Sequence, residues 1–221
     1  MPAAAVRVKL PRPPRPSRTR PAPPRGDKRD AILRAAIRTF ARSGFFSAQV
    51  ADVARTAGVA AGTVYLYFRS KDDLLVSIFE RVMTDAIAEG RAVLAGISDP
   101  VERLRRIAHL HLDRLSRDRD LAVVFQVELR QTTKFMERFS TTLLREYLGI
   151  LRDVIADGQA AGVVRPGVNP TLAAKMLFGA LDEMATNWML SRRRTSLDGV
   201  ADAVVDVFVH GVGVPVAGGR A

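Results

Sequence analysis

From Asp27 onward, apolar residues recur every three to four positions, which is the spacing of one face of an α-helix. The first such stripe contains Ile32, Ala35, Ala36 and Phe40. We find no convincing alternation of apolar and polar residues that would predict a β-strand, and no repeat of fixed period. The sequence therefore predicts an all-α chain of about nine helices.

Glycines and capping residues divide this pattern into segments. Asp27 and Ser70 are suitable helix N-caps, because their side-chain oxygens can accept hydrogen bonds from the free N–H groups of a first turn. Gly44, Gly58 and Gly90 stand where helices are expected to end. The segments predict helices at residues 28–43, 48–57, 61–67, 70–89, 100–116, 119–134, 136–161, 170–191 and 197–211.

The N-terminal segment, residues 1–26, differs in composition from the rest of the chain. Its first 25 residues carry seven Arg or Lys, eight prolines and no acidic residue, so they hold +7 of the formal net charge of +11. They lack the apolar region of a signal peptide, and no other run is long and apolar enough for a membrane span. We interpret 1–26 as a disordered basic arm, either without a role or in non-specific contact with phosphates, on a cytoplasmic protein that makes no membrane contact.

The sequence offers little for catalysis or metal binding. It has no cysteine, P-loop, dinucleotide fingerprint, nucleophile elbow or zinc-binding His-Glu helix. His109 and His111 are two positions apart, so a helix would point them in different directions. Asp182 and Glu183 have no obvious acid–base partner. We therefore expect a protein that is not an enzyme, with no catalytic residues, no metal and no cofactor.

Two of the predicted short helices flank a tight turn at Gly58 and have the features of a helix-turn-helix. Val50, Val53 and Ala54 form an inward stripe on the first, and Val64 with Phe68 holds the second in place. This arrangement leaves the outer face of the second helix free for DNA. Small residues at its start allow a close approach, and the hydroxyls and the lysine that follow can contact phosphate oxygens.

A specific resemblance is carried by the run from Phe46 to Leu75, which ends in YLYFRSKDDLL. This run resembles the signature of the TetR family of regulators, in which the equivalent short helix enters the major groove. The chain departs from that pattern at Ala60, where the family often has a capping Ser or Thr. An alternative for either tyrosine of the second helix is that its ring packs inward. The surface pattern and the resemblance together predict DNA contacts from Gln49, Ala61, Gly62, Thr63, Tyr65, Tyr67 and Lys71.

A helix-turn-helix protein usually reads two half-sites as a dimer, so the remaining helices must supply an interface. The last two predicted helices carry apolar surface suited to a four-helix interface, as the family resemblance also implies. We expect a homodimer through Leu172, Met176, Gly179, Ala180, Ala185, Val200, Ala203, Val204, Val207 and Phe208.

A narrower resemblance is carried by residues 121–131, 147–151 and 178–189. These stretches are similar to the fatty-acid-degradation repressors of the TetR family, often called FadR, which release DNA when they bind long-chain acyl-coenzyme A. Together with the helix-turn-helix, the resemblance covers residues 27–211. The expected domains are a DNA-binding domain at 27–72, a ligand-binding and dimerisation domain at 73–213, and a flexible tail at 214–221.

An acyl chain needs a long apolar channel, and a coenzyme A head needs cations. The helices after Pro100 offer both, with Arg105, Arg106, Arg130 and Arg138 as the available cations. Each apolar residue could instead be plain core, and each arginine a solvated surface cation. Gln126, Glu128 and Arg130 interrupt an apolar helix, which is explained by a solvated face, an internal ion pair or a ligand contact. The predicted ligand residues are Arg106, Leu110, Phe125, Leu129, Arg130, Phe139, Met184 and Trp188.

The sequence thus predicts a TetR-type repressor, most simply of fatty-acid-degradation genes, that binds operator DNA and is released by a long-chain acyl-coenzyme A effector. The alternative is a TetR-type regulator of an efflux pump or another pathway that responds to a different hydrophobic molecule. In either case we expect the ligand to shift the helix at 70–89 and change the spacing of the two recognition helices.

Overall fold

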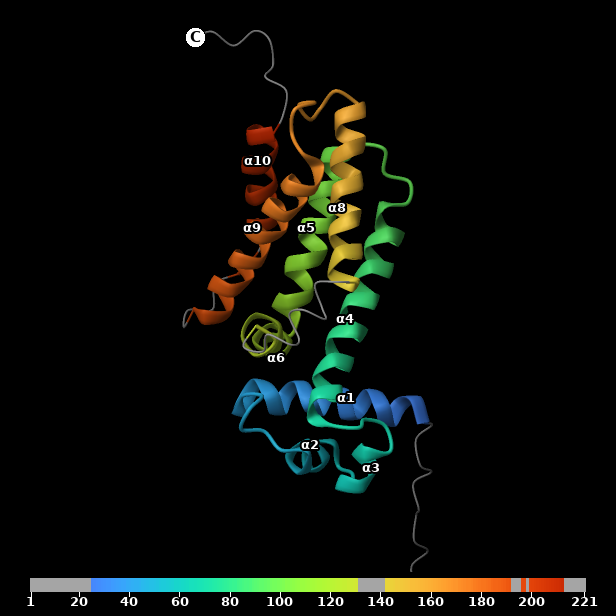
Figure 1. Cartoon of the computed structure of the whole chain (residues 1–221). Helices are drawn as coiled ribbons and strands as arrows, with labels where there is room; N and C mark the ends of the chain where they lie inside the picture. The colour runs from blue at the N-terminus through green and yellow to red at the C-terminus, as the bar shows by residue number, and fades with distance from the viewer. Residues whose placement is uncertain (1–24, 131–141, 192–195, 198, 213–221) are drawn as a thin grey trace, which may run out of the picture.

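The regular elements of the chain are all helices (Figure 1). The computed structural model describes residues 25–130, 142–191, 196–197 and 199–212, and these residues contain no extended β-strand and no helix long and apolar enough to cross a membrane. The all-α prediction is confirmed. The elements are α1 (Arg25–Ser43), α2 (Val50–Ala57), α3 (Ala61–Tyr65), α4 (Lys71–Leu94), α5 (Pro100–Arg117), α6 (Arg119–Val123), η1 (Val124–Glu128), α8 (Leu143–Ala160), α9 (Pro170–Leu190) and α10 (Val200–Val212).

Capping side chains set where three of the long helices begin. The Ser70 hydroxyl accepts a hydrogen bond at 3.0 Å from a backbone N–H in the first turn of α4, as predicted. The side chains of Asp99 and Asn169 do the same for α5 and α9, at 2.9 and 3.0 Å. Pro100 and Pro170 follow at the first helical position, where a missing N–H costs nothing.

The predicted end of the fourth helix at Gly90 is wrong, because α4 continues to Leu94. Gly90 is buried, and a Cβ atom there would lie 4.0 Å from Cδ1 of Ile150. The glycine therefore serves close packing between α4 and α8 instead of ending a helix.

The single helix predicted at 119–134 is also wrong. The structure has α6 followed by one π-helical turn, η1, in which the backbone N–H of Leu129 donates to the carbonyl of Val124 at 3.0 Å. Residues 131–141, which hold the rest of this prediction and the start of the one at 136–161, lie outside the described residues. The predicted helix at 61–67 is shorter than expected and ends at Tyr65.

The helices form two bodies joined by α4 (Figure 1). Helices α1, α2 and α3 pack around Phe40 and Phe68, which are fully buried. Helix α4 starts beside them and runs up into a bundle with α5, α8, α9 and α10. The short α6 and η1 lie at the base of this bundle and contact α1. The upper body thus rests on the lower one through α6 and η1 as well as through α4.

Candidate functional site

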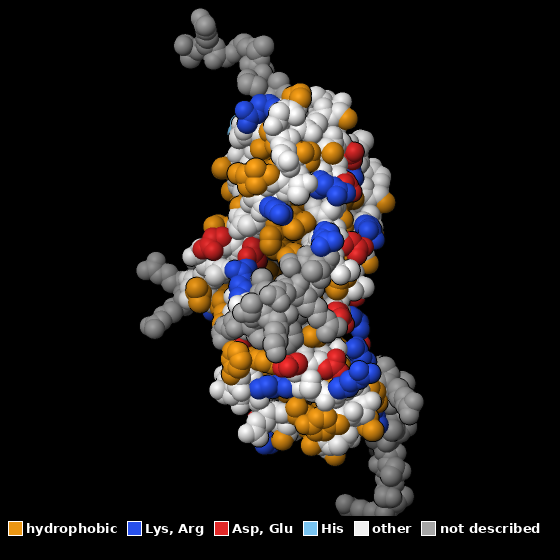
Figure 2. All heavy atoms as spheres, viewed as in Figure 1, with side chains coloured by type: hydrophobic (Ala, Val, Ile, Leu, Met, Phe, Trp, Pro, Cys, Tyr) orange, Lys and Arg blue, Asp and Glu red, His pale blue; other side chains and the backbone are white. Residues whose placement is uncertain are grey.

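The outer surface of α2 and α3 presents most of the predicted DNA contacts to solvent. Gln49, Ala61 and Gly62 are exposed, and nothing lies within 4 Å of the Cβ position of Gly62. Tyr65 is 57% exposed, whereas Val64 behind it is fully buried and fixes the helix to the core. This end of the molecule carries hydrophobic side chains at its surface (Figure 2).

Thr63 and Tyr67 are half-buried. The Tyr67 ring lies 6.5 Å from that of Phe68, so it packs partly inward. Ala60 begins α3 without a side-chain cap, and only its backbone carbonyl accepts, from Thr63 at 2.9 Å. The surface is a helix N-terminus flanked by small residues and hydroxyls, a form that suits a phosphate backbone.

Lys71 lies beside this surface and is engaged within the protein. Its Nζ donates to the carbonyl oxygens of Phe45, Phe46 and Ala48 at 2.7, 2.9 and 3.0 Å. The same ammonium lies 4.7 Å from the centroid of the Phe45 ring. Lys71 thereby ties the start of α4 to the turn between α1 and α2.

The upper body encloses a cavity of about 370 Å³ between α4, α5, η1, α8 and α9. Its wall is largely apolar, and its size falls within the range of small-molecule sites. The Phe79 and Phe125 rings stack at 5.6 Å on one side, and the Tyr147 and Phe178 rings meet edge to face at 6.1 Å. The apolar side chains around the cavity are those of Phe79, Val82, Met83, Ala86, Ile107, Leu110, Leu115, Phe125, Leu129, Leu144, Tyr147 and Phe178.

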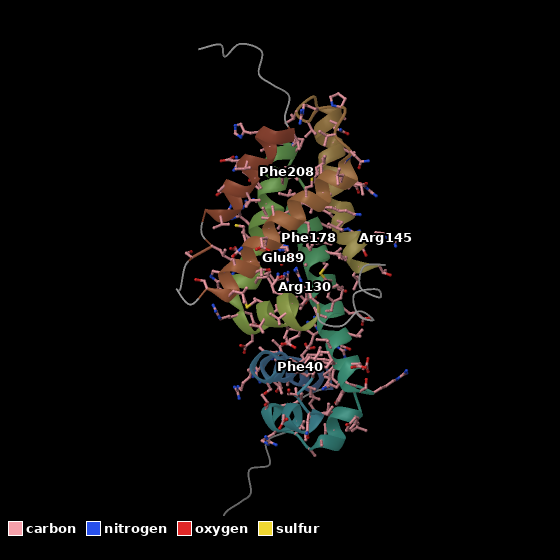
Figure 3. All side chains as sticks on the ribbon, turned by 60° about the vertical axis from the view of Figure 1, so that its left-hand side comes forward. Phe40, Glu89, Arg130, Arg145, Phe178 and Phe208 are labelled. Atoms are coloured by element: carbon pink, nitrogen blue, oxygen red, sulfur yellow. The ribbon has the colours of Figure 1, made fainter. Side chains whose placement is uncertain are left out.

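A polar cluster forms one part of the cavity wall. Asp182, on α9, pairs with Arg130 and accepts a hydrogen bond from Nε2 of Gln126 at 2.9 Å. The Thr186 hydroxyl donates to the other end of the Gln126 amide at 3.0 Å. Figure 3 shows Arg130 and Phe178 near one another in the middle of the bundle. These side chains hydrogen-bond to one another, so this part of the cavity wall is polar and its side chains are held in place.

His111 is the second polar group of the wall. Its Nδ1 lies 3.2 Å from the Tyr147 hydroxyl, and its Nε2 is buried with no hydrogen-bond partner among the described residues. Burial lowers the pKa of His111 to about 4, and burial also raises the pKa of the Tyr147 hydroxyl well above its ordinary value. Both groups are therefore neutral at pH 7.

Four of the predicted ligand residues line this cavity: Leu110, Phe125, Leu129 and Arg130. Met184 and Trp188 do not; they pack against the core on another face of α9, and Arg119 covers the Trp188 ring at 5.4 Å. Arg106 is exposed and pairs with Glu102 on its own helix. Phe139 lies outside the described residues.

Sequence reasoning missed several cavity residues. Phe79 and Met83 were predicted only as part of the helix at 70–89. His111 was considered only as a metal ligand. The signal available for Phe178 and Asp182 was their spacing of four, which places them on one face of a helix. Nothing in the sequence shows that this face meets α5 and η1.

Cations gather in an open groove beside the cavity, between the end of α4, the start of α5 and α8. The groove and the cavity use the same stretches of α4 and α8, because Gly90 and Leu144 line the cavity while the next residues, Arg91 and Arg145, line the groove. Two carboxylates are also present, and Glu146 pairs with Arg91 at 2.9 Å. The groove contains Arg91, Arg103, Arg145 and Arg152 with Glu146 and Asp153.

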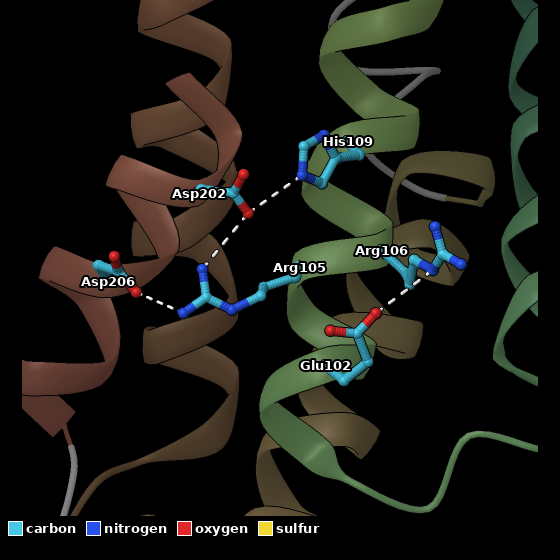
Figure 4. A network of polar contacts seen from close by, with 6 residues as sticks. All are labelled: Glu102, Arg105, Arg106, His109, Asp202 and Asp206. Atoms are coloured by element: carbon cyan, nitrogen blue, oxygen red, sulfur yellow. Dashed lines mark hydrogen bonds and ion pairs between the residues drawn. The ribbon is translucent and has the colours of Figure 1, made fainter. Parts of the chain in front are cut away.

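Helix α10 is fixed to α5 by an ion-pair network (Figure 4). Arg105 pairs with both Asp202 and Asp206, and Nε2 of His109 lies 3.1 Å from Asp202. The hydrogen bond from His109 is the main cause that lowers the pKa of Asp202. Arg105, considered as a coenzyme A contact, thus faces α10 and not the cavity.

The outer sides of α9 and α10 expose much of the predicted dimer surface. Leu172, Met176 and Val207 are among the most exposed large apolar side chains described. Ala185 is the exception, because it is fully buried within the bundle. No group of three or more His, Asp or Glu side chains in the described part of the chain is placed to hold a metal ion.

Comparison with known proteins shows which family shares this architecture. Residues 32–78 match the family described as bacterial regulatory proteins, tetR family, and residues 79–211 match the YsiA-like protein, C-terminal region. The fatty acid metabolism regulator protein of Bacillus subtilis is 33% identical over 181 residues, covering 82% of this chain and 93% of that protein.

Two solved structures of regulators share the fold over nearly their whole length. The fatty acid degradation regulator FadR of Bacillus halodurans has 34% identity and a TM-score of 0.78, covering 83% of this chain and 98% of that chain. FadR of B. subtilis, in complex with stearoyl-CoA, has 32% identity and a TM-score of 0.79 with the same coverage. The chain therefore belongs to the tetR family of bacterial transcriptional regulators and is similar to its fatty-acid-metabolism members.

Proposed function

We propose that this chain is a homodimeric repressor that holds operator DNA of fatty-acid-degradation genes and releases it on binding long-chain acyl-coenzyme A. The observation that carries the proposal is an apolar cavity with a groove of arginines on the same stretches of α4 and α8. An acyl-coenzyme A has the same division, with an apolar chain joined to an anionic nucleotide. A relative of 32% identity, FadR of B. subtilis, has been solved with stearoyl-CoA.

The acyl chain fits the apolar cavity wall, where Phe79, Phe125 and Phe178 supply contact area. The free nitrogen of His111 offers one polar contact inside that wall. A thioester carbonyl is an oxygen acceptor, so it pairs with His111 when Nε2 carries the proton and the Tyr147 hydroxyl donates to Nδ1.

The phosphates of the nucleotide fit the groove. Arg145 is exposed there, and Arg91 needs only to leave Glu146 to bind a phosphate. Arg130 and Arg114 stand at the cavity itself and are paired with Asp182 and Glu89. The cations proposed for the head group are therefore those of the groove, in place of Arg105 and Arg106.

The DNA side of the proposal uses the surface of α2 and α3. The exposed N-terminus of α3, with Gly62 and Tyr65, enters the major groove, and a second copy joined through α9 and α10 places the other half-site. Contacts to the DNA backbone come from Gln49, Thr63, Tyr67 and the charge of Lys71. The chain acts by binding and release, and we propose no catalysis.

The test is fluorescence anisotropy of the dimer on its own upstream DNA, titrated separately with palmitoyl-coenzyme A, palmitate and coenzyme A. Release by the thioester alone is expected. Tight DNA binding that none of the three compounds changes would overturn the assignment of acyl-coenzyme A as the effector. The chain would then still be a DNA-binding regulator.

A charge-removing variant tests the groove. Arg145→Ala should weaken palmitoyl-coenzyme A binding about tenfold, because a charge-assisted contact to phosphate is lost. Arg117→Ala, which removes an exposed arginine paired only with Asp113, is the matched control and should bind as the unaltered protein does. Equal affinities for the two variants would place the head group elsewhere.

A further inference from the structure

Glu128 is a buried carboxylate that reaches from the upper body to the lower one. It is 6% exposed, and its Oε2 accepts a hydrogen bond at 2.7 Å from the backbone N–H of Phe45, 83 residues earlier in the chain. Its two carboxylate oxygens lie 3.9 and 4.0 Å from the Cβ position of Gly44, whose φ of 74° marks the end of α1. The carboxylate thus rests directly on the turn between α1 and α2.

This turn leads directly into the helix-turn-helix. Phe45 is buried, and its ring packs edge to face on that of Phe40 at 5.4 Å in the core of the lower body. The carbonyl of the same residue accepts from Lys71, at the start of α4. Phe45 is therefore held by Glu128 through its N–H and by Lys71 through its carbonyl, so a movement of either one displaces α2.

Glu128 belongs to the π-helical turn whose other side forms the cavity wall. Phe125, Gln126 and Leu129 line the cavity, whereas Glu128 reaches the turn after α1. π-helical turns are rare in proteins, occur mostly as single turns, and are frequent at functional sites. Here the turn puts cavity contacts and a contact to the DNA-binding helices on one short segment.

We propose that Glu128 is the positioning residue through which occupancy of the cavity reaches the helix-turn-helix. An occupant that displaces Phe125 and Leu129 moves η1, and Glu128 carries this movement to the N–H of Phe45 and so to α2. The inference rests on the proposed function in taking the cavity as the effector site. It adds a second connection to the bundle, separate from α4.

The experiment measures coupling, since a merely structural role for Glu128 would change stability and not the ratio of affinities. Operator affinity is measured by anisotropy with and without saturating palmitoyl-coenzyme A, and effector affinity by calorimetry on the DNA-free dimer. The variants are Glu128→Ala, which removes the acceptor, and Glu128→Gln, which keeps an amide oxygen for Phe45. Glu102→Gln, a change at an exposed carboxylate of α5, is the matched control.

Glu128→Ala should bind palmitoyl-coenzyme A within about twofold of the unaltered protein. The ratio of operator dissociation constants with and without effector should fall about tenfold. Glu128→Gln should keep most of the ratio, and Glu102→Gln all of it. An unchanged ratio in Glu128→Ala would overturn the proposal. If that variant fails to fold, Glu128→Asp replaces it, because the shorter side chain withdraws the carboxylate from the N–H of Phe45. A ratio in Glu128→Asp equal to that of Glu102→Gln would then overturn the proposal.

A cavity-filling substitution separates this inference from the effector assignment. Leu144→Trp adds an indole to the cavity from α8, which makes no large contact with the lower body. If palmitoyl-coenzyme A fails to release the unaltered protein, the proposed function fails, and Leu144→Trp then acts as the occupant. It should weaken operator binding about tenfold with Glu128 present and less than about twofold in the Glu128→Ala background. Equal effects in both backgrounds, or no effect in either, would overturn the coupling role.

Discussion

The ammonium group of Lys71 lies within 3.0 Å of three backbone carbonyls, and the nearest of them is that of Phe45 at 2.7 Å. An ammonium has three hydrogens, so these contacts use all of its donors. A phosphate at the predicted DNA surface would therefore meet the charge of Lys71 and not a free N–H. The residue is first of all a clamp between α4 and the turn before α2.

Lys71→Ala should accordingly lower both stability and operator affinity. Three charge-assisted hydrogen bonds disappear, so we expect a loss of about 1 to 3 kcal/mol in the free energy of unfolding, measured by urea denaturation. The slope of operator affinity against salt should fall by about one unit if the charge also faces a phosphate. Arg117→Ala, at the exposed end of α5, should change neither quantity. An unchanged stability for Lys71→Ala would show that the clamp contributes nothing.

Much of the fold could be predicted because its signals are local. Ser70 and the Gly44 turn act within a few residues, and the stripe that ends in Phe40 needs only helical spacing. Gly90 misled the prediction because its reason is tertiary: it lets α8 approach α4. The π-helical turn at Val124–Glu128 was also missed; its residues contact α1 and, through Gln126 and Asp182, α9, and these contacts cannot be read from the local sequence.

The cavity could be predicted only in part, because its lining is chosen by how five elements pack. Leu110, Phe125 and Leu129 were found as apolar residues on helices that proved to face inward. On α9, Phe178 and Asp182 share the cavity face. Trp188 follows six positions after Asp182, a rotation of roughly 240° at about 100° per residue, which takes it to another face. The sequence alone does not show what each face of α9 contacts, so it cannot distinguish the cavity face from the face that carries Trp188.

The buried His111 makes stability depend on pH. Its pKa in the folded protein is about 4, below the ordinary value of 6.5, so the unfolded chain binds more protons between these values. The stability is fully present above pH 6.5 and is lost as the pH falls toward 4, by roughly 1 kcal/mol per pH unit. Urea unfolding from pH 7 to 4 should show a flatter dependence in His111→Gln than in the unaltered protein. His210→Gln, at an exposed histidine of α10 that contacts a backbone carbonyl, serves as the control, and a dependence as flat in that variant would assign the effect elsewhere.

Two neighbouring arginines of α5 should differ in their effect on assembly. Arg105 holds α10 through Asp202 and Asp206, whereas Arg106 contacts only Glu102 on its own helix (Figure 4). Arg105→Ala frees one side of the proposed dimer surface, and we expect the dimer dissociation constant to rise about threefold to tenfold. Arg106→Ala should leave it unchanged. Sedimentation equilibrium measures both, and equal constants would mean that α10 is positioned without this network.

Two glycines of α8 should respond in opposite directions to alanine. A Cβ atom on Gly158 would lie 2.9 Å from Cγ2 of Val164 and 3.4 Å from Cβ of Pro100, and Val164 sits in the turn that leads to α9. Gly158→Ala should therefore destabilise the protein by about 1 to 3 kcal/mol, because the turn has to move. Nothing lies within 4 Å of the Cβ position of Gly149, so Gly149→Ala should add about 0.5 to 1 kcal/mol by reducing the entropy of the unfolded chain. Urea unfolding followed by circular dichroism compares the two variants. A stabilising Gly158→Ala would show that the turn moves aside at no cost. The close packing of α8 against this turn would then not be required for stability.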